Sequence, residues 1–84
     1  MLTTVQVRNI MMRNGIWRDV YTNKTRANCG TERRVKCYMP SDANKATALI
    51  RELEQAAGKE NVKVTDGDLN YHGTPGITVR CTLA

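Results

Sequence analysis

The chain of 84 residues has no phenylalanine, only one tryptophan, and no hydrophobic run near the ~20 residues that a transmembrane helix needs. Its N-terminus lacks the continuous apolar stretch of a signal peptide. Three cysteines, Cys29, Cys37 and Cys81, form an odd set without a close pair, unlike the even disulfide framework of small secreted domains. We therefore expect a cytoplasmic protein with reduced thiols, folded as a single domain over residues 1–84 and without a membrane partner.

Residues that could carry catalysis or bind a metal are also few. His72 is the sole histidine, and the scattered thiols give it no partner at a recognisable spacing. Cys37 and Cys81 fall on the apolar sides of alternating segments, where cysteine behaves as a small hydrophobe. Asp66 and Asp68 stand in a glycine-containing turn, but calcium loops need more oxygen ligands at regular spacing. The sequence thus predicts no catalytic residues, no metal, no cofactor and no small-molecule substrate.

One helix is predicted over residues 42–57. Ser41 can cap its N-terminus, Asp42 lies in the first turn, where a carboxylate suits the helix dipole, and Gly58 follows as a stop. The apolar residues of this segment recur at the spacing that lays one stripe along a helix; they are Ala46, Leu49, Ile50, Leu53 and Ala57. We expect this stripe to cover one face of a sheet.

The other segments alternate polar and apolar residues with a period of two, which predicts strands with one dry and one solvent-facing side. Asn14-Gly15 is a strong hairpin signal and is expected to join residues 11–13 to the second strand. The strands are expected at residues 4–8, 16–21, 33–39, 62–65 and 77–83. The prediction is an α+β fold: a two-layer domain of order β-β-β-α-β-β, in which one helix packs on an antiparallel or mixed sheet of four to five strands.

The second expected strand has two orientations. Either Trp17 and Tyr21 face the helix, or Ile16 and Val20 do. We favour the first, because burial of the only tryptophan would supply much of the core. The second orientation places Trp17 on the solvent-facing side beside basic residues, as a stacking platform.

Positive charge is concentrated in the first half of the chain. Residues 1–40 hold eight basic and two acidic residues, a net +6, whereas residues 41–84 hold five and six, a net −1. Such a one-sided charge attracts phosphate backbones or acidic protein surfaces, although charges on an open sheet face also serve solubility and block edge aggregation. Basic side chains with interleaved Tyr and Thr suit phosphate contact. The candidate binding residues expected on the solvent-facing side of the sheet are Arg8, Arg34, Lys36, Tyr38 and Arg80, joined by Arg18 if Trp17 is buried. Those expected in the flanking turn and loop are Arg13, Lys24, Arg26 and Arg33.

The layout of three strands and then a helix, with Asn14-Gly15-Ile16-Trp17 at the first turn, resembles the arm-type DNA-binding domains of phage integrases over residues 5–55. The two strands expected after the helix depart from that layout. We predict a non-enzymatic binding module whose basic N-terminal half and sheet face engage nucleic acid or a nucleoprotein. The alternative is a small inhibitor of the phage type, such as an anti-CRISPR protein, which binds an acidic surface of a host or defence complex and blocks its nucleic-acid site.

Overall fold

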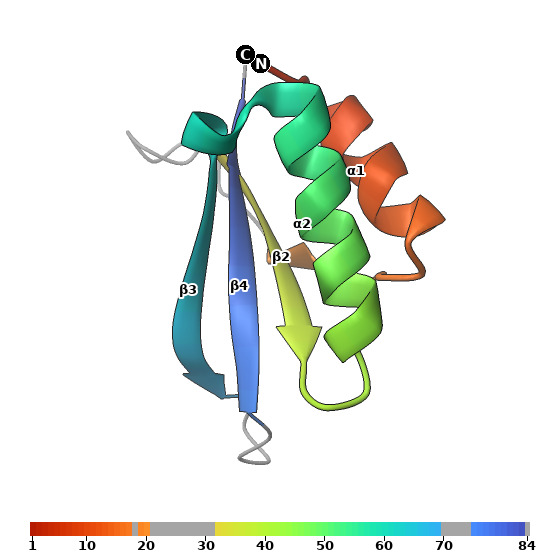
Figure 1. Cartoon of the computed structure of the whole chain (residues 1–84), viewed down its shortest axis with the longest axis vertical. Coiled ribbons are helices and arrows are strands. Elements are labelled where there is room, and N and C mark those ends of the chain that lie inside the picture. The colour runs from red at the N-terminus through yellow and green to blue at the C-terminus, as the bar shows by residue number, and fades with distance from the viewer. Residues whose placement is uncertain (18, 21–31, 70–74, 84) are drawn as a thin grey trace.

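Two helices lie on one face of an antiparallel sheet in the computed structural model, which describes residues 1–17, 19–20, 32–69 and 75–83 (Figure 1). The elements, in chain order, are α1 (Thr4–Arg13), β1 (Asp19–Val20), β2 (Glu32–Tyr38), α2 (Ala43–Ala57), a short 3-10 helix η1 (Lys59–Asn61), β3 (Val62–Leu69) and β4 (Pro75–Thr82). The predicted α+β class is confirmed. The prediction of one helix is wrong, because a second helix, α1, precedes the sheet.

The strands are arranged in the order β1-β2-β4-β3, in which β1 contributes two residues beside β2. Both β2 and β3 run antiparallel to the central strand β4, so they run parallel to each other. Helix α2 connects them and crosses over β4, which is a split β-α-β arrangement. A bridge between Leu2 and Leu83 brings the two ends of the chain together beside the sheet (Figure 1).

The segment 4–8, expected to be a strand, is the start of α1. A capping box fixes this start: Thr3 Oγ1 accepts from the Gln6 backbone N–H at 3.2 Å, and the Gln6 side chain accepts from the Thr3 backbone N–H at 2.8 Å. The alternation of Val5 and Val7 is misleading, because Val5 is 60 % exposed. The buried residues instead follow helical spacing; they are Val7, Ile10 and Met11. The strand layout behind the resemblance to integrase arm domains is thus absent from the described part of the chain.

Asn14-Gly15 ends α1 and does not form a hairpin turn. The Gly15 N–H donates to the Met12 carbonyl and the Ile16 N–H donates to the Met11 carbonyl, both at 3.0 Å. This pair of bonds is the Schellman motif, which needs the left-handed conformation that Gly15 adopts at φ 73°. The same tolerance of positive φ that favours Asn-Gly in hairpins therefore serves a helix terminus here.

The helix predicted at 42–57 is confirmed as α2, which Gly58 follows at φ 91°. Four residues of the predicted stripe are buried and Ile50 is partly buried against them; the four are Ala46, Leu49, Leu53 and Ala57. Ser41 is not the N-cap. Asp42 takes that position, and its Oδ2 accepts from the Tyr38 backbone N–H at 2.9 Å, which ties the end of β2 to the start of α2.

The core lies between the helices and the sheet. Helix α2 contacts β2, β4 and β3, while α1 lies beside α2 and contacts β2. Four sheet residues with no exposed surface line this side, as their alternation predicted; they are Val35, Cys37, Val79 and Cys81. Both cysteines are free, and burial raises the pKa of the Cys81 thiol, which keeps it neutral. No helix in the described ranges has the length and apolar character to cross a bilayer.

Candidate functional site

The sheet side opposite the helices carries basic residues on three neighbouring strands. Arg34 on β2, Arg80 on β4 and Lys63 on β3 stand directly opposite one another in register, so their side chains leave the same side of the sheet. Strands lie about 4.8 Å apart, so this row spans about 10 Å. Lys36 follows Arg34 by two residues and shares its side. We call Arg34, Lys36, Lys63 and Arg80 the basic face.

Glu32 lies on the same side of β2 as Arg34 and Lys36, beside the basic face. Its Oε1 accepts from Arg34 Nε at 2.8 Å and from Arg80 Nη2 at 3.0 Å, and its Oε2 accepts from Arg80 Nε at 3.1 Å. Burial alone would raise the pKa of Glu32, but hydrogen bonds from Arg80 and Arg34, with their charges, hold that pKa below its ordinary value. The carboxylate is therefore ionised at neutral pH, and the basic face together with Glu32 carries a net +3.

The basic face keeps donors available to a ligand even with Glu32 in place. The side chains of Arg34 and Arg80 are 43 % and 37 % exposed, and Arg34 contacts Glu32 through Nε alone. A guanidinium has five N–H donors, so the terminal amino groups of Arg34 can still contact an anion. Within the described ranges, no ion pair or hydrogen bond holds the side-chain ammonium group of Lys36 or of Lys63. This surface can bind several anionic groups at once.

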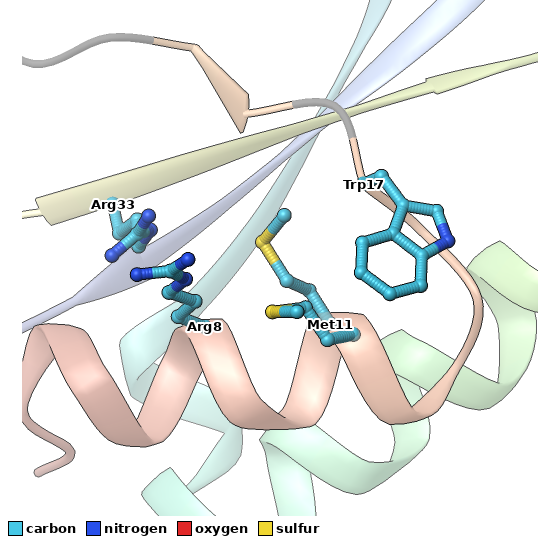
Figure 2. Close-up of a pocket in the computed structure, with 5 residues that line it drawn as sticks. Arg8, Met11, Trp17 and Arg33 are labelled. Carbon is cyan, nitrogen blue, oxygen red and sulfur yellow. The ribbon is translucent and has the colours of Figure 1, made fainter.

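A second feature lies on the helical side, where a pocket of about 310 Å³ opens between α1 and β2 (Figure 2). Its lining residues are Arg8, Met11, Met12, Trp17 and Arg33. The favoured orientation of Trp17 is wrong, because Trp17 is 68 % exposed and Ile16, 1 % exposed, is in the core instead. The physical reason is the end of α1: the residue after the left-handed glycine of a Schellman motif packs back on the helix. Ile16 holds that position, so Trp17 points outward.

Two arginines from different elements meet in this pocket. Arg33, expected in a flanking loop, lies in β2 on the same side as Val35, and its Nη1 donates to the Thr4 carbonyl at 3.0 Å and to Thr4 Oγ1 at 2.7 Å. Arg8, expected on the sheet, is exposed on α1, where no partner among the described residues holds its guanidinium. Figure 2 shows these two guanidinium groups pointing toward each other at one end of the pocket and the Trp17 indole at the other.

The remaining predicted residues belong to neither feature. Arg13 forms an ion pair with Glu52, which also accepts from Asn14 Nδ2 at 3.0 Å. The hydrogen bonds from Arg13 and Asn14 lower the pKa of Glu52, so this carboxylate links the end of α1 to α2. Arg18, Lys24 and Arg26 lie outside the described residues. The structure thus brings Arg34, Lys36, Tyr38 and Arg80 onto one side of the sheet and Arg8 and Arg33 into a separate pocket.

Residues of both features are missing from the list of candidate binding residues, among them Lys63 of the basic face and Met11 of the pocket. Strand alternation places Lys63 on the side of β3 away from the helices, and the strand register places it opposite Arg80. The pocket could be found only if α1 were recognised as a helix. The described residues include no group of three or more His, Cys, Asp or Glu side chains that could hold a metal ion, and His72 and Cys29 lie outside them. Comparison of the chain with protein-family models, curated proteins and solved structures finds no match.

Proposed function

We propose that this chain is a non-enzymatic module that binds nucleic acid by contacting phosphates with its basic face. The observation that carries the proposal is the row Arg34–Arg80–Lys63, which crosses three adjacent strands with its exposed donors on one side of the sheet. Each cation that neutralises a phosphate releases a counterion, which favours binding without requiring a particular base sequence. The guanidinium groups add paired N–H donors that match phosphate oxygens.

The composition of this side favours nucleic acid over an acidic protein surface. Protein interfaces usually centre on apolar and aromatic side chains, from which charged residues are depleted. The described side chains on the side of β2, β4 and β3 away from the helices are instead charged or carry a hydroxyl, and of these Thr78 is buried; they are Glu32, Arg34, Lys36, Tyr38, Lys63, Thr65, Thr78, Arg80 and Thr82. A surface of this kind suits the regular charges of a phosphate backbone.

A matched pair of double variants tests the proposal. Lys36→Gln with Lys63→Gln removes two cations from the basic face, and Lys45→Gln with Lys59→Gln removes two exposed cations from α2 and η1, with the same change in net charge. Affinity for a labelled duplex is measured by anisotropy over a range of salt concentrations. We expect the slope of log affinity against log salt to become shallower by about 1.8 in the first variant, since each phosphate contact contributes about 0.9. The second variant should keep the original slope.

Equal losses in the two double variants would show that net charge, and not the basic face, governs binding. Absence of binding to both duplex and single-stranded nucleic acid at low salt would overturn the proposal. That outcome would favour the inhibitor alternative, in which the same surface contacts an acidic protein. Recovery of a partner from lysate, with and without nuclease treatment, would then identify it.

A further inference from the structure

We propose that the pocket between α1 and β2 binds one unpaired nucleobase and its phosphate, which makes the module selective for single-stranded nucleic acid. The inference rests on the proposed function and adds a second site on the helical side of the sheet. Arg8, Met11, Met12, Trp17 and Arg33 line this site, which we call the Trp17 pocket.

The indole of Trp17 provides a stacking surface. Trp17 is the only tryptophan of the chain, and it is 68 % exposed although Ile16 beside it is buried. Every base has a π-face, so an exposed indole binds unpaired bases with little regard to sequence. Met11, which is buried, and Met12, which is partly buried, also line the pocket, and their polarisable thioethers give it an apolar surface that can adapt to a flat ring.

The opposite end of the pocket suits a phosphate. The guanidinium groups of Arg8 and Arg33 point toward each other there, although like charges repel (Figure 2). An anion at this end of the pocket would lie beside both guanidinium groups, and no partner among the described residues competes for the donors of Arg8. Arg33 is already held by its two hydrogen bonds to Thr4, so little of its conformational freedom is lost when a ligand binds.

The size of the pocket and the chemistry of its ends select the kind of ligand. A volume of about 310 Å³ is at the small end of ligand pockets and suits one base with its phosphate. A base that remains paired and stacked in a duplex has no free face for Trp17 to contact. The Trp17 pocket therefore distinguishes single strands from duplexes, whereas the basic face binds both.

The fluorescence of Trp17 reports occupancy directly, because no other tryptophan contributes. The full chain is titrated with a short oligothymidylate, with an abasic oligomer of equal length, with a duplex of equal length and with thymidine monophosphate. We expect the oligothymidylate to quench the emission, while the abasic oligomer and the duplex bind without quenching. The mononucleotide should bind far more weakly than the oligothymidylate, because it lacks the contacts with the basic face.

Two pairs of variants measure the contribution of each end. Trp17→Ala should weaken binding of the oligothymidylate about 5- to 150-fold, the effect of losing one stacked base, and leave duplex affinity unchanged. Trp17→Phe keeps an aromatic ring and should recover part of the loss. Arg8→Gln should weaken binding of the oligothymidylate more than Arg51→Gln, which removes another exposed arginine, from α2. Thermal unfolding of each variant, followed by circular dichroism, verifies that it is folded.

Unchanged oligothymidylate affinity in folded Trp17→Ala, with duplex binding intact, would overturn the Trp17 pocket and leave the basic face standing. The same holds if Trp17→Phe and Trp17→Ala both bind like the original chain. Binding of thymidine monophosphate as tight as that of the oligothymidylate would show a free-nucleotide site and overturn single-strand selectivity.

Discussion

The carboxylate of Glu32 should hold the two arginines of the basic face in place while it lowers the affinity of that face for nucleic acid. Glu32 accepts hydrogen bonds from both Arg34 and Arg80, and it is the negative charge nearest to them in the described part of the sheet. Glu32→Gln keeps the size of the side chain and removes its charge. Stability and affinity should therefore change in opposite directions.

The magnitude follows from the burial of the partners. Hydrogen bonds to charged groups contribute about 1.5–3 kcal/mol when they are buried. Arg34 and Arg80 are each more than a third exposed, so solvent screening reduces the expected loss in Glu32→Gln to about 1 kcal/mol. In a domain of this size that loss corresponds to a fall in Tm of about 4–8 °C. The basic face would gain one net positive charge, which should steepen the salt slope of duplex binding by up to about 0.9.

The difference in unfolding free energy between the original chain and Glu32→Gln should depend on pH. This dependence separates the effect of the Glu32 charge from the effect of its shape. The pKa of Glu32 is lower in the folded chain than the ordinary value of 4.5, so its ionised form stabilises the fold above that pH. The stabilisation is lost as the pH falls through the folded pKa. Urea denaturation of the original chain and of Glu32→Gln should therefore give a difference in unfolding free energy that is full near neutral pH and shrinks toward zero in acid. Glu52, whose pKa is also lowered, is present in both proteins and cancels.

A difference that stays constant however far the pH is lowered would refute this reasoning, since a protonated Glu32 carries no more charge than the glutamine. It would mean that the shape of the side chain, and not its charge, supports the two arginines. A lower duplex affinity in Glu32→Gln than in the original chain would refute the expected gain in affinity, because it would show that the arginines need Glu32 to reach phosphates.

Two further substitutions test the helices. Leu53→Ala should lower the unfolding free energy measured in urea by about 2–5 kcal/mol, because Leu53 is fully buried on α2. Arg51→Ala, on the exposed side of α2, should change it by less than about 0.5 kcal/mol, and similar losses in both variants would contradict the core assigned to α2. Gly15→Ala should cost about 1–2 kcal/mol through its φ of 73° alone, since the nearest side-chain atom, Lys45 Cε, would lie at an ordinary 3.5 Å. Gly15→Asn should cost less, and equal stability of Gly15→Ala and the original chain would argue against the Schellman turn.

The parts of the fold that the sequence predicted correctly are those where several cues agree. The stripe of α2 extends over about three turns, and the helix ends before Gly58, so helical periodicity has no competing interpretation there. Alternation over seven residues placed Val35 and Cys37 inside and Arg34 and Lys36 outside on β2. That alternation also places Arg33 on the inner side of β2, whereas Arg33 was expected in a flanking loop.

The first seventeen residues were misread because a short segment can satisfy two periods at once. Val5 and Val7 alternate like a strand, yet Val7, Ile10 and Met11 also follow the spacing of a helix. The deciding signal was local: Thr3 and Gln6 have the spacing of a capping box, which a strand cannot use. Read together with Asn14-Gly15 as a helix end, that signal would have identified α1.

The expectation of a hairpin at Asn14-Gly15 also led to the wrong orientation of Trp17. The backbone conformation of Gly15 controls both the end of α1 and the direction of the Trp17 side chain. In a hairpin strand, Trp17 can be turned toward the core by a shift of one residue in register. After the Schellman motif there is no such freedom, since the Ile16 N–H is bonded to the Met11 carbonyl and its side chain packs inward. Trp17 is then directed away from the core and lines the pocket to which α1 and β2 also contribute. The conformation of Gly15 thereby couples the stability of α1 to the geometry of the Trp17 pocket, so Gly15→Ala should also reduce quenching by oligothymidylate in molecules that remain folded.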